Sequence, residues 1–132
     1  MPVVFRKDAT LTLRIDARTR YALDLLSRVK RRSVSELVVD QLRKLVGEEL
    51  SSIDVAGTAT PLVDAVWDVF APDRLVKLAM HAPELLTDDE AKVWRVISED
   101  ETYLPKRGKP DFASIRRDWV KIQKKVREYE AI

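Results

Sequence analysis

The side chains best suited to a chemical task lie near the N-terminus and are basic or hydroxylated. In the stretch ATLTLRID, residues 9–16, Thr10, Thr12 and Arg14 alternate with apolar residues. Arginine can donate two hydrogen bonds to a guanine edge, and threonine offers a hydroxyl or a methyl group to a base. The chemistry of these three side chains therefore suits contacts with DNA bases. The alternative is that they only solvate the outer face of a strand.

A second set of residues suits the phosphate backbone of DNA. A basic run, KRR, is followed by SVSE, in which Ser33 and Glu36 match a helix-capping pattern. A helix N-terminus binds anions through its free amides, and lysine and arginine add a salt-dependent attraction. The alternative is that the charges form a solvated face and that Ser33 only caps the helix. The predicted phosphate contacts are Arg6, Lys7, Lys30, Arg31, Arg32, Ser33, Val34 and Ser35.

Residues for catalysis or metal binding are sparse. The chain has one histidine, His81, and no cysteine, so a site with two histidine ligands or a thiolate is excluded within one chain. The acidic run Asp88, Asp89 and Glu90 is typical of the first turn of a helix, where carboxylates interact favourably with the macrodipole. No glycine-rich phosphate loop or nucleophile motif is present. We predict a protein that is not an enzyme and that uses no cofactor or metal.

The elements that must hold the N-terminal side chains are a strand and two helices. The alternation at residues 9–16 predicts a strand, Asp16 is placed to cap a helix, and Ser33 begins a second helix with a wide apolar stripe. No other segment is typical of a strand, and an unpaired strand leaves its backbone groups unsatisfied. We therefore predict that two copies of the chain pair their strands across a two-fold axis. The predicted dimer core consists of Leu11, Leu13, Ile15, Leu26, Leu37, Val38 and Leu42.

Residues 9–46, a strand followed by two helices, resemble the ribbon-helix-helix family of Arc, MetJ and CopG type. The LTLRID strand, the Ala22/Leu26 helix face and RSVSELVVDQL in the second helix carry the resemblance. The turn KRRS departs from it, because it lacks the glycine often found there. The resemblance implies a homodimer whose doubled β-ribbon enters the major groove of DNA. It also implies that the outward side chains of this ribbon, Thr10, Thr12 and Arg14, contact base edges. The predicted fold class is mostly α, with one strand that pairs across the homodimer.

The rest of the chain is predicted to be a separate helical region. A small, polar stretch at residues 51–60 is the expected linker between a domain at 1–50 and a domain at 61–132. Thr87 and Glu90 repeat the capping pattern, and the last helix carries apolar residues at alternating spacings of three and four. Three tryptophans lie on apolar helix faces, where either a core role or binding of a protein partner is open: Trp67, Trp94 and Trp119.

Charge is unevenly distributed along the chain. Residues 1–46 contain 11 Lys/Arg and 5 Asp/Glu, residues 47–104 contain 4 and 13, and residues 105–132 contain 9 and 4. A basic N-terminal region indicates binding to a polyanion, joined to a region with another task. No apolar run approaches the roughly 18 residues of a membrane span, and the first residues lack a secretory signal. A cytoplasmic, nucleoid-associated protein is expected.

Together these features predict a sequence-specific transcriptional regulator, a repressor or autorepressor that binds a palindromic operator as a homodimer. Its predicted partners are double-stranded DNA and a second copy of the chain, with a higher oligomer left open. One alternative is an antitoxin whose C-terminal region binds a protein toxin. Another is an accessory DNA-binding protein of plasmid maintenance or conjugation.

Overall fold

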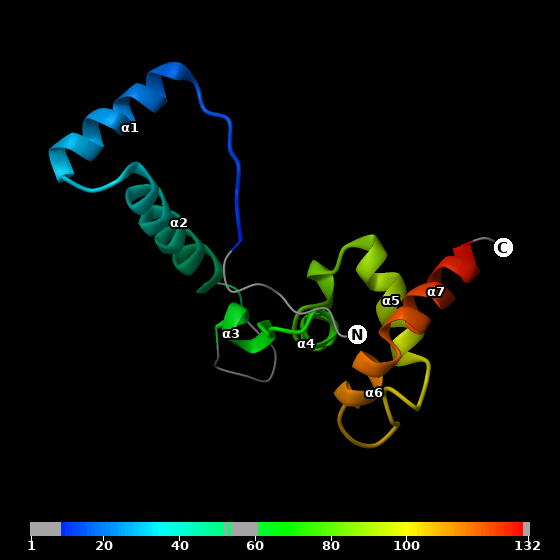
Figure 1. Ribbon diagram of the computed structural model, residues 1–132. Coiled ribbons are helices and arrows are strands. Elements are labelled where there is room, and N and C mark those ends of the chain that lie inside the picture. The colour runs from blue at the N-terminus through cyan, green and yellow to red at the C-terminus, as the bar shows by residue number, and fades with distance from the viewer. Residues whose placement is uncertain (1–8, 52, 54–60, 131–132) are drawn as a thin grey trace. The chain divides into compact units, whose positions relative to one another are not determined.

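The computed structural model describes residues 9–51, 53 and 61–130 of the chain. In this part of the chain the regular elements are helices (Figure 1). They divide into two compact units, the N-terminal unit up to residue 53 and the C-terminal unit from residue 61. None of the helices in these ranges is long and apolar enough to cross a membrane.

The N-terminal unit contains two helices that contact each other, α1 (Ala17–Lys30) and α2 (Val34–Ser51). Asp16 caps α1, because its Oδ2 accepts a hydrogen bond from Thr19 N at 3.0 Å. Ser33 Oγ accepts from Glu36 N at 3.1 Å at the start of α2. Both predicted helix starts are confirmed, and in each a side-chain oxygen satisfies an amide that the first turn leaves free.

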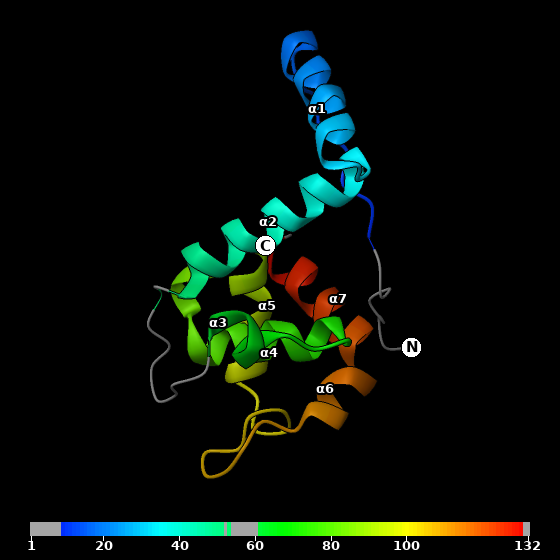
Figure 2. The ribbon, with the colours of Figure 1, turned by 90° about the vertical axis from the view of Figure 1, so that its left-hand side faces the viewer.

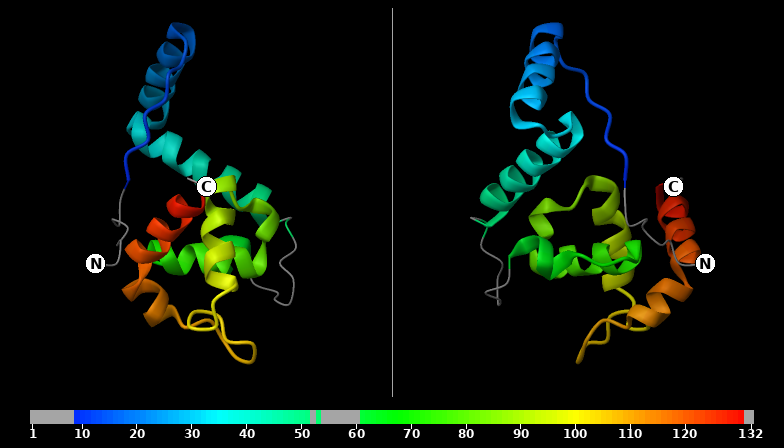
Figure 3. Two further views of the ribbon diagram at one scale, coloured as in Figure 1. Left: turned by 90° about the vertical axis from the view of Figure 1, so that its right-hand side faces the viewer. Right: turned by 60° about the vertical axis from the view of Figure 1, so that its left-hand side comes forward.

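The ribbon-helix-helix fold class predicted from residues 9–46, with a strand at residues 9–16, is wrong for this chain. The described residues contain no β-strand and no sheet, and this segment leads into α1 without regular secondary structure (Figure 3). The alternation of Leu11, Leu13 and Ile15 is a local pattern, whereas a strand exists only when a second segment shares its backbone hydrogen bonds. No described segment of the chain does so, and these three side chains are 69%, 61% and 47% exposed.

The C-terminal unit packs short helices around a core of its own (Figure 2). Its elements are α3 (Leu62–Val66), α4 (Ala71–His81), the 3-10 helix η1 (Pro83–Leu85), α5 (Asp88–Ser98), α6 (Phe112–Arg117) and α7 (Trp119–Glu130). The capping box predicted at Thr87 and Glu90 is confirmed, since each side chain accepts the other residue's backbone amide, at 3.1 and 3.0 Å. The buried core consists of Leu75, Val76, Val96, Ile97, Tyr103, Ile115, Trp119 and Ile122.

The last predicted helix is divided in two at Asp118. This residue ends α6, and its carbonyl accepts the amide of Ile122 at 2.8 Å to begin α7. The hydroxyl of Tyr103 donates to Asp118 Oδ2 at 2.8 Å. Burial, together with this carboxylate, raises the pKa of Tyr103 to about 12. A buried tyrosine therefore contacts the break between the two helices, while Ile115 and Trp119 on either side of it remain in the core.

Alanine substitutions at the two glycines that the structure describes should have opposite effects on the free energy of unfolding. Gly47 lies inside α2, where a Cβ would meet no atom within 4 Å. Gly47→Ala should raise the free energy of unfolding by about 0.5–1 kcal/mol, because alanine loses less backbone entropy in a helix. Gly108 has a φ of 123°, which L side chains rarely adopt. Gly108→Ala should therefore lower the free energy of unfolding by about 1 kcal/mol or more.

Urea unfolding followed by far-UV circular dichroism measures both changes. The three tryptophans, at 67, 94 and 119, all lie in the C-terminal unit. The unfolding transition followed by tryptophan fluorescence should therefore shift for Gly108→Ala, which lies in the same unit. It should stay in place for Gly47→Ala, which lies in the N-terminal unit. A loss of helical stability in Gly47→Ala would contradict a helix that runs through this position.

Candidate functional site

The turn between α1 and α2 carries the basic run of the N-terminal unit. Arg31 follows α1 in the left-handed conformation, with φ 54° and ψ 41°. The amide of Arg32 donates to the carbonyl of Ser27 at 3.2 Å and closes the turn. The turn therefore forms the geometry that usually takes glycine, at a cost of about 1–2 kcal/mol for an L side chain.

The basic side chains at this turn differ in how their charge is compensated. Arg32 is paired with α2, since its Nη2 lies 2.5 Å from Asp40 Oδ2 and its Nε lies 3.4 Å from Glu36 Oε2. Its hydrogen bond to Asp40 raises the pKa of Arg32 further. Lys30 and Arg31 are exposed and form no ion pair within the described residues. Of the predicted basic run, these two residues are the ones available to a phosphate.

The start of α2 leaves two backbone donors open. The side chain of Ser33 accepts from Glu36 N, and its carbonyl accepts from Leu37 N at 3.1 Å. The amides of Val34 and Ser35 have no partner in the part of the chain that the structure describes. The capping role and the predicted anion-binding role of this turn are therefore compatible, because they use different amides.

The predicted base contacts lie in the segment before α1. Thr10, Thr12 and Arg14 are exposed, but no strand holds them on a common face. Arg14 has no ion pair among the described residues. Arg6 and Lys7, predicted as phosphate contacts, lie outside the described residues.

The predicted dimer core is only partly covered. No residue of α1 or α2 is buried. Leu11, Leu13, Ile15 and Leu26 are exposed, whereas Leu37, Val38 and Leu42 are half-buried. Further exposed apolar or aromatic side chains, which the predicted core omitted, are Tyr21, Leu25, Val29, Val39, Leu45 and Val46. Helical spacing in the sequence shows that several of these residues share a face, but spacing cannot show whether another element of the same chain covers that face.

The three tryptophans have different environments in the C-terminal unit. Trp119 is 7% exposed and belongs to the core, and Trp94 is partly buried against that core. Trp67 is 50% exposed. It lines a cavity of about 450 Å³, here called the α3–α4 groove. The groove is lined by Val63, Val66, Trp67, Ala71, Arg74, Leu75, Leu78, Asp89, Glu90, Val93, Trp119 and Gln123.

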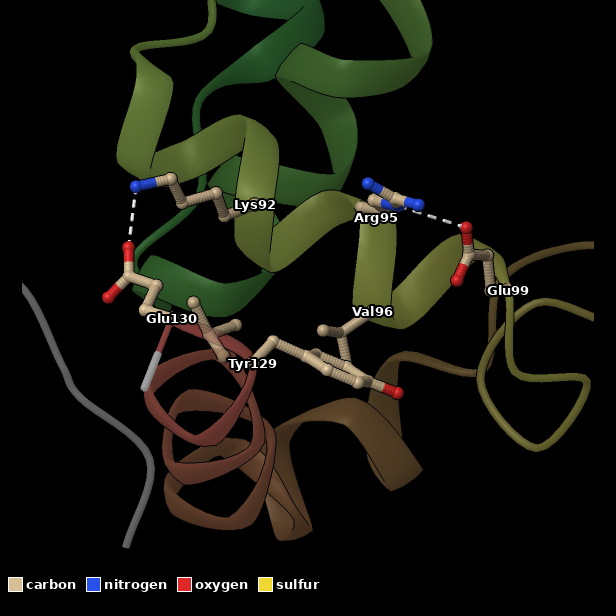
Figure 4. Close-up of a pocket in the computed structure, with 7 residues that line it drawn as sticks. Lys92, Arg95, Val96, Glu99, Tyr129 and Glu130 are labelled. Atoms are coloured by element: carbon tan, nitrogen blue, oxygen red, sulfur yellow. Dashed lines mark hydrogen bonds and ion pairs between the residues drawn. The ribbon is translucent and has the colours of Figure 1, made fainter. Parts of the chain in front are cut away.

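A second cavity, of about 360 Å³, lies between α5 and α7 and has its charges paired (Figure 4). Lys92 Nζ lies 2.5 Å from Glu130 Oε1, and Arg95 Nε lies 3.2 Å from Glu99 Oε1. The ring of Tyr129 lies toward Val96 between these pairs. The four charged side chains that line this cavity thus compensate one another, which gives a charged ligand little to bind.

The C-terminal unit also buries one carboxylate with incomplete partners. Asp73 is 6% exposed, and its Oδ1 lies 3.4 Å from Arg116 Nε without forming a hydrogen bond. The Arg116 Nε instead donates to the carbonyl of Phe112 at 3.3 Å, and its guanidinium lies over the ring of Phe70 at 4.6 Å. Burial raises the pKa of Asp73, and the charge of Arg116 offsets only part of this effect.

The side chains that commonly bind metal ions are scattered in the described ranges. Within them, no three His, Asp or Glu side chains are grouped to hold a metal ion. His81 is the last residue of α4 and is half-buried.

Comparisons of the chain with protein-family models, with curated proteins and with solved structures found no match. The chemistry of the exposed side chains is therefore the basis for assigning a function.

The buried carboxylate predicts a specific pH dependence of stability. The folded state raises the pKa of Asp73. The folded chain therefore binds a proton on the Asp73 carboxyl group more tightly than the unfolded chain does. The contribution of the protonated Asp73 side chain to stability is present at low pH and is lost as the pH rises through the pKa of the folded state. The free energy of unfolding of the wild type, relative to that of Asp73→Asn, should therefore fall as the pH rises from about 4 to neutral.

Asp118→Asn is the matched control for this measurement. Hydrogen bonds from Arg117 and Tyr103 lower the pKa of Asp118, so its contribution to stability is present at neutral pH and is lost as the pH falls. Relative to Asp118→Asn, the wild type should therefore gain stability as the pH rises. Urea unfolding at a series of pH values gives both curves. Parallel curves for wild type and Asp73→Asn would show that burial does not penalise the charge of Asp73.

Proposed function

We propose that this protein is a DNA-binding transcriptional regulator that acts as a homodimer, as a repressor or autorepressor at a palindromic operator. One observation carries the proposal. The N-terminal unit exposes both a set of apolar side chains and a set of basic side chains that have no acidic partner among the described residues. The first property calls for a protein partner, and the second favours a polyanion.

A second copy of the chain is the partner that best accounts for the exposed apolar side chains. No described residue of this small unit is buried, so α1 and α2 lack the apolar burial that stabilises small domains. Covering a half-exposed leucine or valine contributes on the order of 1 kcal/mol, and ten large apolar or aromatic side chains of this unit are available. In a two-fold dimer each copy offers the same face, so one set of residues supplies both sides of the interface.

DNA is the polyanion that the basic side chains favour. Lys30 and Arg31 lie at the turn that precedes the open amides of Val34 and Ser35. Lysine, arginine and a helix N-terminus are common phosphate ligands, and they position a protein on a duplex. Arg14 adds the side chain best suited to read guanine. A two-fold dimer would present two such sets to the two halves of a palindrome and would block polymerase by occupying the operator.

The homodimer predicts a single-substitution effect on assembly. Leu26→Glu, in α1, would place a charge at the proposed interface, where it could not be solvated. The variant should be monomeric and should lose helical content, because α1 and α2 would remain uncovered. Sedimentation equilibrium and far-UV circular dichroism measure the two properties. Val120→Glu, at a position in α7 that is 64% exposed, is the control and should behave as the wild type. A wild-type chain that is monomeric with both N-terminal helices intact would refute the homodimer.

DNA binding predicts a change in salt dependence. Each phosphate contact contributes about 0.9 to the slope of log affinity against log salt concentration. The double variant Lys30→Ala/Arg31→Gly should therefore reduce that slope by about 2 per chain. Glycine preserves the left-handed turn at position 31, so the loss reports charge rather than unfolding. Fluorescence anisotropy with a duplex obtained by selection and sequencing measures the affinity.

Two further variants define the specificity of that experiment. Lys92→Ala/Arg95→Ala removes two basic side chains that are already paired with acids, so it should leave the salt slope unchanged. Arg14→Ala should lower the preference for the selected duplex over a random one by about 1–3 kcal/mol for each lost base contact. An unchanged preference would remove Arg14 from the base-reading role. Equal slopes for the wild type and the Lys30/Arg31 variant would refute the proposed phosphate contacts.

A further inference from the structure

We propose that the α3–α4 groove of the C-terminal unit binds an amphipathic helix of a partner protein, with apolar residues on one face and lysine or arginine beside them. This is an interaction function separate from DNA binding, and it uses a different unit of the chain. The argument rests on the apolar lining of the groove, on the helices that form its walls and on the charge at its edge.

The groove combines a buried floor with an exposed aromatic wall. Leu75 and Trp119 line it and are each 7% exposed, so they also belong to the core. Val63, in α3, and Trp67, which follows this helix, are 42% and 50% exposed. Exposed tryptophan is uncommon on a protein surface and is enriched where binding energy is concentrated. An apolar side chain that enters the groove would therefore contact a preformed floor and cover the ring of Trp67.

The walls of the groove favour a helical ligand. The residues that line it come from α3, α4, α5 and α7 or adjoin these helices (Figure 2). A helix wall satisfies its own backbone hydrogen bonds, so it offers no row of free donors and acceptors to an extended peptide. A bound helix satisfies its own backbone as well and needs only side-chain contacts, as in other helix-in-groove complexes.

The charge at the edge of the groove favours a basic ligand. Asp89 and Glu90, in the first turn of α5, line the groove, and the Asp89 side chain is 96% exposed with Lys92 Nζ no closer than 3.9 Å. The basic side chain of the lining, Arg74, is engaged within the unit. It donates to the carbonyl of Asp68 at 3.0 Å, and its guanidinium lies 5.3 Å from the centroid of the Trp67 ring. The Asp89 carboxylate at the edge is thus more accessible to a ligand than the guanidinium, and it selects lysine or arginine over an acidic side chain.

The test uses two synthetic helical peptides and the full chain. Both peptides carry leucine at the i, i+3, i+4 and i+7 positions of one face, and they differ only in having lysine or glutamate at the flanking positions. Fluorescence anisotropy of labelled peptide should give saturable binding of the lysine peptide, at least about tenfold tighter than binding of the glutamate peptide at low salt. The difference should narrow at high salt. Absence of saturable binding, or equal binding of the two peptides, overturns the proposal.

Substitutions place the binding in the groove. Val63→Asp and Trp67→Ala change exposed side chains, so the unit should fold, as far-UV circular dichroism would show. Each should weaken the lysine peptide by about tenfold or more. Asp89→Asn should reduce the preference for lysine while leaving apolar binding. Val120→Asp, outside the groove, should bind as the wild type, and a loss there equal to that of Val63→Asp would refute the location.

A second copy of the chain is the competing occupant. If the wild type were oligomeric in sedimentation equilibrium and Val63→Asp were monomeric, the groove would belong to a dimer interface and the proposal would fail. This outcome is distinguishable from failure of the DNA-binding function, because the DNA affinity and its salt slope are measured on different variants.

Discussion

The constraint on which the structure depends is that no described residue of the N-terminal unit is buried. Two helices joined by a tight turn cannot enclose a core, because each helix has only one neighbour to cover its apolar face. The energy that would stabilise α1 and α2 must then come from contacts outside this pair of helices. The same geometry leaves Lys30, Arg31 and the open amides of α2 accessible. In this unit the need for a partner and the ability to bind a polyanion share one cause, which is a small unit with a large surface.

The C-terminal unit, in contrast, covers apolar side chains with its own helices. Its helices are short, but α4, α5, α6 and α7 cover one another around a single core. That core is complete enough to bury Asp73 beside Arg116, an arrangement that costs desolvation and is tolerated because the surrounding apolar contacts offset it. It is also incomplete at one place, where α3 leaves Trp67 half exposed over the groove. The two units therefore differ in kind, since one lacks a core and the other has a core with an open side.

Local patterns in the sequence were reliable where the physics is local. The caps at Asp16, Ser33 and Thr87 depend on a side chain and an amide that are three residues apart, so neighbouring residues determine them. The alternation at Leu11, Leu13 and Ile15 is equally local, but the strand it predicted depends on hydrogen bonds to another segment. Arg32 shows a related limit. Its place in a basic run indicated a phosphate contact, whereas the helical spacing to Glu36 and the reach to Asp40 give it acidic partners instead.

The sequence by itself determined the helix starts, the separation of a basic N-terminal region from an acidic middle, and the apolar pattern of the last helices. Each of these follows from residue type and short-range spacing. The tertiary structure alone decided which apolar residues are covered. It separated Trp119 in the core from Trp67 in the groove, it divided the last helix at Asp118, and it left the apolar faces of α1 and α2 exposed. The reason is that burial is a property of the elements that surround a residue, and those elements come from distant parts of the chain or from another molecule.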